Sequence, residues 1–419
     1  MIDISYLRER PDELAASLAR RGFDIDLEAL GVLDVNRRKV RSEAEVVRSS
    51  QNTLGKSISS LAGDEKQAAI QEAGQLAGRY KELLAEADDL DERFDALWIS
   101  LPNMTDPTAA DGFEEEDAVE IKRVGEQTEF GFAAADHLDL GVALGVIDVE
   151  RAVKISGSRF ALKKGKLALL EMGLMRWGVT EVAKHGFTPV IPPVLVREHA
   201  LFGTGIFPGD KEQVYSVRED DLYLVGTSEV PLAAMHGDEI LDADDLPIRY
   251  VGSSTCFRVE AGTYGKDTRG LFRVHQFDKA EMFSFVHPDH SRDEHDFLLE
   301  REEELVRALE IPYRVVNVAA GDLGSSAAKK YDIEAWLPGQ ERYREITSTS
   351  NTTDFQTRRL KVRYKDEDGK NQLLHTLNGT VVTPRHMIAL IENHQQADGS
   401  IRIPDALVPY TGFDTIDAT

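Results

Sequence analysis

Two consecutive stretches near the N-terminus place apolar residues at alternating spacings of four and three. The first comprises Val40, Ala44, Val47, Gln51, Leu54, Ile58 and Leu61, and the second Ala69, Ala73, Leu76, Tyr80, Leu83, Ala87, Leu90, Phe94 and Leu97. This spacing puts an apolar stripe along one side of an α-helix. Because the break at residues 62–64 is short, the pattern predicts an antiparallel helical hairpin. Helices of about 28 residues would be about 40 Å long, so we expect the hairpin to project as an arm.

The two predicted helices carry opposite charges. Residues 36–60 contain six basic and two acidic side chains, a balance of +4, whereas the second helix is rich in Asp and Glu. Either the two helices complement each other in a solvated hairpin, or the basic face binds a polyanion. The whole chain has 49 basic and 74 acidic residues and a net charge of −25, which excludes a general nucleic-acid binder. RNA binding would therefore need a local basic patch.

Composition narrows the class of protein further. A chain of 419 residues is long enough for two or three domains. The single cysteine, Cys256, excludes an internal disulfide and a zinc site built from several thiolates. No apolar run approaches the roughly 18 residues of a membrane span, and residues 1–14 lack the apolar core of a signal peptide. These features predict a cytoplasmic protein that has no membrane partner.

The C-terminal two-thirds predicts many strands with few helices between them. Strands are expected at residues 222–225, 250–260, 272–286, 313–318, 331–336 and 373–378, and helices at 167–184 and 385–394. Three prolines in residues 187–196 restrict that run to an edge or interface strand. This order favours an α+β fold with an antiparallel sheet. We expect an N-terminal domain at 1–103, a connector at 104–150 and a catalytic domain at 151–419.

Residues 250–286 predict a strand, a cationic glycine-rich loop and a returning strand. Arg258 and Glu260 would share one strand face, because alternate residues do, and the loop carries Lys266 and Arg269. Such a hairpin could place Arg258 on a phosphate while Glu260 holds an amine. A cross-strand ion pair accounts for the same residues equally well.

Two further segments favour nucleotide phosphate chemistry. Residues 344–351 combine Glu345 with several hydroxyls, and such hard oxygen ligands suit Mg²⁺ that bridges phosphates. A helix beginning near Arg385 would present a guanidinium that can bind phosphate oxygens bidentately. The chain has no glycine-lysine phosphate-binding loop of the Walker type. The spacing of His287, His290 and His295 fits no standard zinc motif, so we expect these residues in a solvated loop.

In combination these segments resemble the bacterial-type seryl-tRNA synthetases, which are class II aminoacyl-tRNA synthetases. The resemblance rests on the opening Met1-Ile2-Asp3, the arm, and the segments 227–229, 257–260, 274–277, 345–351 and 377–379 in that order. It implies a class II antiparallel sheet flanked by helices and preceded by an antiparallel coiled-coil arm. It also implies a homodimer whose interface is built by Pro192, Pro193 and the helix before them. Between Gly379 and Arg385 the chain has five residues, where the family pattern commonly has six.

The resemblance implies activation of L-serine by ATP to seryl-adenylate, with release of diphosphate, and transfer to tRNA(Ser), and to tRNA(Sec) as well, with release of AMP. Catalytic roles would fall to Arg258, Glu260 and Arg385. Serine would be bound by Thr227, Ser228, Glu229, Glu281 and Thr380. ATP would be bound by Arg258, Val259, Glu260, Val274, Glu345, Ile346, Thr347, Ser348 and Arg385. Mg²⁺ would be held by Glu345 and Ser348, with no zinc. The arm would contact tRNA through Arg37, Arg38, Lys39, Arg41 and Arg48.

Three alternatives remain. A ligase that loads an amino acid onto a carrier protein would usually lack the long arm. An inhibitor-resistant seryl-tRNA synthetase paralogue would keep the same catalytic residues, so one sequence does not separate it from the housekeeping enzyme. A coiled-coil RNA-binding scaffold with a degenerate body is disfavoured, because Arg258, Glu260, Glu345 and Arg385 are all present.

Overall fold

The computed structural model describes residues 1–262 and 269–417, and Lys266 of the predicted cationic loop lies outside them. The described chain forms two compact units. The helical unit comprises residues 3–19 and 23–101, and the sheet unit comprises residues 1–2, 20–22 and 102 onward. The predicted boundaries at 103/104 and 150/151 remain a proposal.

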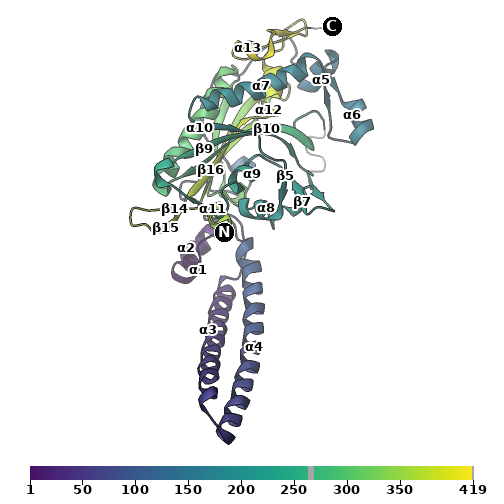
Figure 1. Ribbon diagram of the computed structural model, residues 1–419. Coiled ribbons are helices and arrows are strands. Elements are labelled where there is room, and N and C mark those ends of the chain that lie inside the picture. Colours follow the sequence, from purple (N-terminus) through teal and green to yellow (C-terminus); the bar gives the residue numbers. More distant parts are fainter. Residues whose placement is uncertain (263–268, 418–419) are drawn as a thin grey trace. The chain divides into compact units, whose positions relative to one another are not determined.

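The helical unit contains the predicted antiparallel hairpin, drawn in purple and blue in Figure 1. Its helices are α1 (Ser5–Glu9), α2 (Pro11–Arg20), α3 (Leu27–Ser57) and α4 (Gly63–Ser100). Asp26 caps α3, because its carboxylate accepts a hydrogen bond of 2.8 Å from the Ala29 amide. Helix α4 ends before Leu101-Pro102, as the sequence predicts. Both long helices exceed the expected 28 residues, at 31 and 38.

The predicted apolar stripe holds along most of the hairpin and fails at its end. Ala44, Leu83 and Phe94 are buried as expected. Leu97, however, is 43% exposed, and Trp98 is buried in its place and stacks on Phe94. The prediction for Leu97 is therefore wrong. An α-helix has 3.6 residues per turn, so a strict heptad drifts around it and the buried stripe moves to the next residue.

The sheet unit is built on one eight-stranded sheet in the order β1-β11-β12-β13-β16-β10-β9-β4 (Figure 1). These strands are β1 (Val119–Val124), β4 (Thr188–Val190), β9 (Ile248–Phe257), β10 (Gln276–Val286), β11 (Tyr313–Asn317), β12 (Lys329–Leu337), β13 (Arg342–Thr353) and β16 (His375–Val382). Every neighbouring pair is antiparallel except β4 with β9. The antiparallel sheet and the proline-containing edge strand are thus confirmed.

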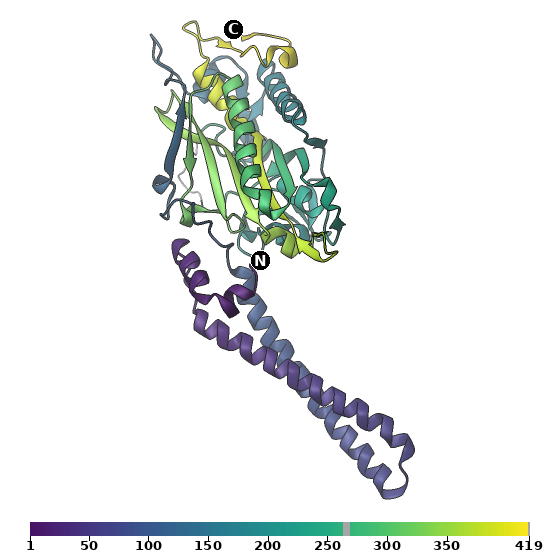
Figure 2. The same ribbon diagram turned by 90° about the vertical axis from the view of Figure 1, so that its left-hand side faces the viewer.

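Three helices pack on this sheet and close the main core (Figure 2). They are α7 (Lys166–Ala183), α10 (Ser291–Ala308) and α12 (Pro384–Asn393). The predicted helices at 167–184 and 385–394 are therefore confirmed. Leu170, Leu298 and Leu390 from these helices are fully buried with Met282 of the sheet. This packing holds the central strands of the sheet and helix α12 in fixed positions.

Smaller elements surround the sheet. The remaining helices are α5 (His137–Ala143), α6 (Val149–Ser156), α8 (Glu198–Thr204), α9 (Glu229–Ala234), α11 (Phe355–Leu360) and α13 (Val408–Thr411). The remaining strands are β2 (Ile147–Asp148), β3 (Leu162–Lys163), β5 (Leu195–Arg197), β6 (Ser216–Val217), β7 (Leu222–Leu224), β8 (Ile240–Leu241), β14 (Arg363–Lys365), β15 (Asn371–Leu373), β17 (Ile401–Arg402) and β18 (Thr415–Ile416).

Three local predictions need correction. Strand β9 ends at Phe257, and Glu260 has a φ of +54°, so Arg258 and Glu260 do not share one face of a strand. Residues 342–353 form a central strand that the sequence analysis did not predict. His295 is not in a solvated loop: it is buried in α10, and its ring nitrogen lies 3.0 Å from the Thr349 carbonyl oxygen.

Candidate active site

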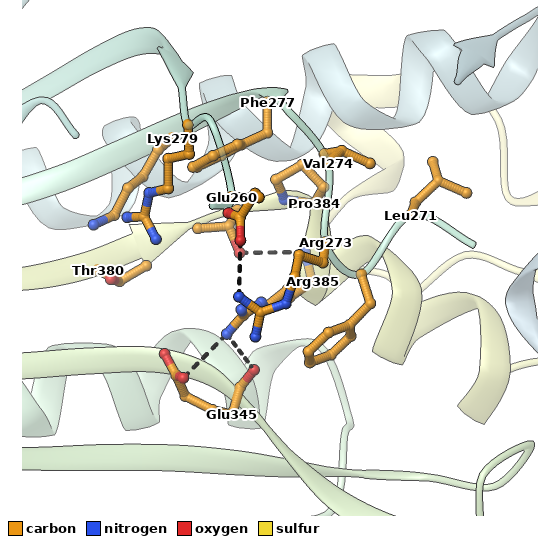
Figure 3. Close-up of a pocket in the computed structure, with 13 residues that line it drawn as sticks. Glu260, Leu271, Arg273, Val274, Phe277, Lys279, Glu345, Thr380, Pro384 and Arg385 are labelled. Carbon is orange, nitrogen blue, oxygen red and sulfur yellow. Dashed lines mark hydrogen bonds and ion pairs between the residues drawn. The ribbon is translucent and has the colours of Figure 1, made fainter. Parts of the chain in front are cut away.

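A cavity of about 230 Å³ lies over β10, β13 and β16 and beside the N-terminus of α12 (Figure 3). Its walls come from segments far apart in the sequence. The lining residues are Arg258, Glu260, Leu271, Phe272, Arg273, Val274, Phe277, Lys279, Glu345, Thr380, Thr383, Pro384 and Arg385. The cavity therefore unites three residues that the sequence assigns to phosphate chemistry, Arg258, Glu345 and Arg385.

Arg385 occupies the first turn of α12. Thr383 caps this helix by accepting a hydrogen bond of 3.2 Å from the Arg385 amide. The guanidinium of Arg385 lies 3.2 Å from the carboxylate of Glu345 and donates a 3.0 Å hydrogen bond to the Glu345 carbonyl oxygen. Desolvation acts in the opposite direction, but the positive charges of Arg385 and Lys330 lower the pKa of Glu345. Glu345 is therefore an anion beside a cation at neutral pH.

A β-bulge puts Glu345 and Ser348 on the same side of β13. Residues three apart in a regular strand point to opposite faces. Here the pairing of β12 with β13 shifts at Ile346: Glu345 lies opposite Glu334, and Ser348 lies opposite Asp332. The shift adds one residue and turns Ser348 back to the side of Glu345. The two predicted metal ligands therefore become neighbours.

Asp332 joins this pair, although the sequence analysis missed it. Its side chain is buried, one carboxylate oxygen lies 3.3 Å from the Lys330 ammonium, and the other has no hydrogen-bond partner among the described residues. Burial raises the pKa of Asp332. Two carboxylates and a hydroxyl are the hard oxygen donors that Mg²⁺ prefers, so the residues present fit this ion.

The segment that returns from the hairpin loop, residues 270–274, forms one wall of the cavity through residues 271–274. The Phe272 ring lies between two guanidinium groups, 3.7 Å from that of Arg344 and 4.5 Å from that of Arg385. Arg273 forms an ion pair of 2.9 Å with Glu260 (Figure 3). The sequence analysis left a cross-strand ion pair as an alternative; the ion pair of Glu260 with Arg273 differs from it, because both residues lie outside β9 and β10.

Arg258 lies where the hairpin meets the segment before α9. Its Nε donates a 3.1 Å hydrogen bond to the Gly226 carbonyl oxygen, and its guanidinium lies 5.3 Å from the Phe277 ring centroid. Because the guanidinium lines the cavity, Arg258 joins the phosphate residues to the segment Thr227-Ser228-Glu229.

Thr380 lines the cavity, and Glu281 lies directly opposite it across β10 and β16. Lys279, on the same side of β10, forms an ion pair with Glu281 and donates a 3.3 Å hydrogen bond to the Thr227 hydroxyl. The sequence analysis missed Lys279. The alternation of side chains along a strand could have found it, because Phe277, Lys279 and Glu281 are spaced by two.

Glu229 lies close enough to Glu281 for their charges to interact, although neither residue lines the cavity. Its carboxylate accepts a 2.6 Å hydrogen bond from the side-chain amide of Gln356. Desolvation and the neighbouring negative charge of Glu281 raise the pKa of Glu229 to about 7. Burial also raises the pKa of Glu281, against the effect of Lys279. Two carboxyl groups with destabilised anionic forms can bind a small ammonium group.

Eight of the predicted site residues do not line the cavity: Thr227, Ser228, Glu229, Val259, Glu281, Ile346, Thr347 and Ser348. Ser228 is fully buried, and its hydroxyl lies 2.8 Å from that of Ser254. Ile346 belongs to the main core, and Thr347 donates a 2.8 Å hydrogen bond to Glu302 of α10. Val259 does not line the cavity, and its amide donates to the Gln213 carbonyl oxygen.

The chain is similar to known proteins over its full length. Residues 1–105 match the family described as seryl-tRNA synthetase N-terminal domain, and residues 213–394 match the tRNA synthetase class II core domain (G, H, P, S and T). The Serine–tRNA ligase of Thermobifida fusca (strain YX) is 50% identical over 417 residues, 99% of each chain. This chain belongs to the seryl-tRNA synthetases.

Solved structures agree with this family. The seryl-tRNA synthetase from Pyrococcus horikoshii complexed with ATP has a TM-score of 0.94 at 40% identity and covers all of both chains. The cytoplasmic Serine-tRNA ligase from Naegleria fowleri in complex with AMP has a TM-score of 0.88 at 30% identity, over 100% of this chain and 99% of that one. The predicted family, the class II fold and the assignment as a serine–tRNA ligase are therefore confirmed.

In this seryl-tRNA synthetase, most of the predicted tRNA-binding arginines have partners within the arm. Arg37 and Arg38 pair with the buried carboxylate of Asp34 at 2.8 and 3.0 Å. Arg41 lies 3.0 Å from Asp88 and also pairs with Asp91. Arg48 of α3 donates a 3.2 Å hydrogen bond to the Tyr80 hydroxyl of α4, and Lys39 is exposed. The interpretation in which the two helices complement each other thus accounts for Arg41 and for Arg37, which also lies 3.2 Å from Asp91 of α4. The partner of Arg38, Asp34, belongs to α3 itself.

No helix within residues 1–262 and 269–417 combines the length and the apolar character that crossing a bilayer requires.

Proposed function

We propose that the protein activates L-serine with ATP to seryl-adenylate and transfers the seryl group to tRNA(Ser), and also to tRNA(Sec). One observation carries the proposal: a single cavity is lined by Thr380, which lies opposite Glu281 in the sheet, and by Arg258 and Arg385. An ammonium group suits the carboxylate beside Thr380, and a polyphosphate suits the two arginines. The two solved relatives described with ATP and AMP support a nucleotide in this fold. We also propose a cytoplasmic location, because tRNA charging serves translation there.

In the first step, a carboxylate oxygen of serine attacks the α-phosphorus of ATP. The new oxygen–phosphorus bond forms as the bond to the bridging oxygen breaks, and diphosphate leaves with that electron pair. Arg258 would offset charge at the α-phosphate, and Arg385 would hold the terminal phosphate. No side chain needs to form a covalent bond, so rate enhancement comes from orientation and charge stabilisation.

In the second step, the 3′-hydroxyl of the tRNA's terminal adenosine attacks the carbonyl carbon of the adenylate. The ester forms, AMP leaves with the electrons of the carbonyl–oxygen bond, and the proton of the hydroxyl is lost to solvent. Glu229 and Glu281 would keep the serine ammonium in place, and Thr380 would contact its hydroxyl. A pocket that hydrogen-bonds a hydroxyl strongly rejects analogues that lack it.

Glu345 and Ser348 would hold Mg²⁺, with Asp332 beside them. Two observations support these residues as ligands. The bulge puts Glu345 and Ser348 on one side of β13, and one carboxylate oxygen of Asp332 has no hydrogen-bond partner among the described residues. When bound, the ion would neutralise charge on the phosphates.

Serine-dependent exchange of ATP with diphosphate, measured without tRNA, tests the site. Arg258→Ala should abolish exchange while circular dichroism and the melting temperature stay near wild type. Exchange near the wild-type rate would refute the assigned role of Arg258. A screen of all amino acids should show exchange with serine alone, and exchange with another amino acid would refute the substrate.

The arm would bind tRNA through backbone contacts and shape, the mode by which double-stranded RNA is usually recognised. The double variant Arg38→Ala/Arg41→Ala should weaken tRNA charging and leave exchange unchanged. Loss of both activities would contradict a separate RNA-binding role, and so would unchanged charging.

We also propose a homodimer. The edge strand β4 is followed by Ile191, 92% exposed, and by Pro192 and Pro193, and α7 exposes Met172 by 69%. Large exposed apolar side chains of this kind mark protein interfaces. Light scattering should give twice the mass of the chain, and Ile191→Asp should shift the protein toward monomer. A wild-type monomer at micromolar concentration would contradict the proposal.

A further inference from the structure

His137 lies outside the cavity yet holds the segment that forms one of its walls. The backbone amide of Leu271 donates a 3.1 Å hydrogen bond to Nε2 of His137. The His137 side chain is 4% exposed, so this hydrogen bond is shielded from water. Leu271 and the residues that follow it, Phe272, Arg273 and Val274, line the cavity.

Glu392 fixes the ring of His137 from the other side. Nδ1 of His137 lies 2.8 Å from one carboxylate oxygen of Glu392, and the His137 amide donates to the same oxygen at 3.2 Å. The other oxygen accepts a 3.0 Å hydrogen bond from the Gly339 amide. Because a backbone amide can only donate, Nε2 must be the acceptor, which leaves Nδ1 to carry the proton toward Glu392.

Glu392 belongs to the same helix, α12, as Arg385. The two residues are seven apart, two helical turns, so they share one side of that helix. The connection from Leu271 through His137 to Glu392 thus ties the returning segment to the helix that carries Arg385. Phe272, next to Leu271, has its ring 4.5 Å from the Arg385 guanidinium. The connection therefore joins the segment that contacts Arg385 to the helix that carries Arg385.

The fit between the returning segment and the imidazole is close. Gly270 has a φ of +88°, and a Cβ atom added there would lie 2.4 Å from Nε2 of His137. Only glycine allows the backbone to approach the ring this closely. Arg269, one residue earlier, forms ion pairs with Asp136, the N-cap residue of α5, and with Asp139 in its first turn. Arg269 and Leu271 thus fasten the segment to the N-terminus of α5, and Gly270 between them allows the close approach.

We propose that His137, oriented by Glu392, is a positioning residue for ATP: it sets the place of residues 270–274 relative to Arg385. It touches neither substrate. The inference rests on the proposed ATP site and adds a residue that lies behind that site.

The test compares His137→Ala with a matched control, Gln395→Ala, in serine-dependent exchange. Gln395 is also buried and makes hydrogen bonds of 2.9 and 3.0 Å to Ala135 and of 2.8 Å to the Glu392 carbonyl oxygen, which leaves the Glu392 carboxylate and the His137 ring in place when Gln395 is truncated. Losing one buried hydrogen bond changes an equilibrium by about tenfold. We therefore expect His137→Ala to raise KM for ATP about tenfold, with KM for serine and kcat within about twofold. Gln395→Ala should lower the melting temperature and leave KM for ATP unchanged.

Two further variants, His137→Gln and Gly270→Ala, test the proposal even if His137→Ala folds poorly. His137→Gln offers an amide oxygen to Leu271 and should recover most of the ATP affinity. Gly270→Ala should raise KM for ATP, and less so in combination with His137→Ala, because the smaller side chain makes room for the added methyl group. An unchanged KM for ATP in His137→Ala would overturn the proposal, as would an equal rise in Gln395→Ala. Arg385→Ala distinguishes failure of this inference from failure of the proposed ATP site. If this variant keeps full exchange, the proposed ATP site itself is wrong.

Discussion

The affinity for serine should depend on pH through Glu229. Burial and the negative charge of Glu281 raise the pKa of Glu229 to about 7 in the empty site. A carboxyl group with this pKa is ionised in about one tenth of the molecules at pH 6 and about nine tenths at pH 8. The serine ammonium binds the ionised form, so KM for serine should fall about tenfold between pH 6 and pH 8. Glu281, whose pKa is also raised, acts in the same direction.

The assay is diphosphate exchange at saturating ATP, with serine titrated at pH 6, 7 and 8. KM for ATP, measured in the same buffers, is the control, because the proposal assigns Glu229 to serine and not to ATP. Glu229→Gln keeps the size of the side chain and its contact with Gln356. This variant should have a higher KM for serine at pH 8 and a clearly flatter pH profile. A KM for serine that stays constant from pH 6 to 8 in the wild-type protein would refute the electrostatic account of this pocket.

Three further changes test other parts of the structure. Lys279→Met removes the ion-pair partner of the buried Glu281, so KM for serine should rise at least about tenfold in the exchange assay. Trp98→Ala should lower the free energy of unfolding by about 3 kcal/mol in urea titrations, because this side chain is 4% exposed. Hydrogen bonds from two arginines outweigh desolvation and lower the pKa of Asp34 to about 2. The stabilisation is therefore complete above about pH 4 and lost as the pH falls toward 2, and Asp34→Ala should remove this acid dependence from helical melting curves.

The sequence predicts the fold well where apolar periodicity decides it. The alternating spacing of four and three gave both long helices, and the prolines near Pro189 placed β4 at the edge of the sheet. The residues of β13 were the exception. They are mostly Thr, Ser and Asn, and a strand buried by polar side chains shows no apolar alternation. Its burial depends on partners such as Glu302, which hydrogen-bonds Thr347 and comes from another part of the chain.

Individual site residues are predicted less completely, because side-chain direction depends on pairing irregularities. Resemblance to the family named Glu345 and Ser348, but regular strand geometry would separate them. Only the bulge in the pairing of β12 with β13 brings them to one side. The same bulge turns Ile346 and Thr347 toward α10 and the core, away from the cavity. A bulge arises from the register of two strands, and register is a property of long-range pairing.

The arm shows why a count of charges is a poor measure of a binding surface. Residues 36–60 carry a balance of +4, yet Arg37, Arg38 and Arg41 are paired with aspartates of the same unit. An ion pair presents a dipole to its surroundings, and the field of a dipole falls off faster with distance than that of a charge. To contact phosphates, these arginines would have to exchange one anionic partner for another, which gains less than neutralising a free phosphate with a solvated cation. Each paired arginine should therefore contribute less to the attraction of RNA than an exposed cation such as Lys39 does, while Arg37 and Arg41 also link the two helices.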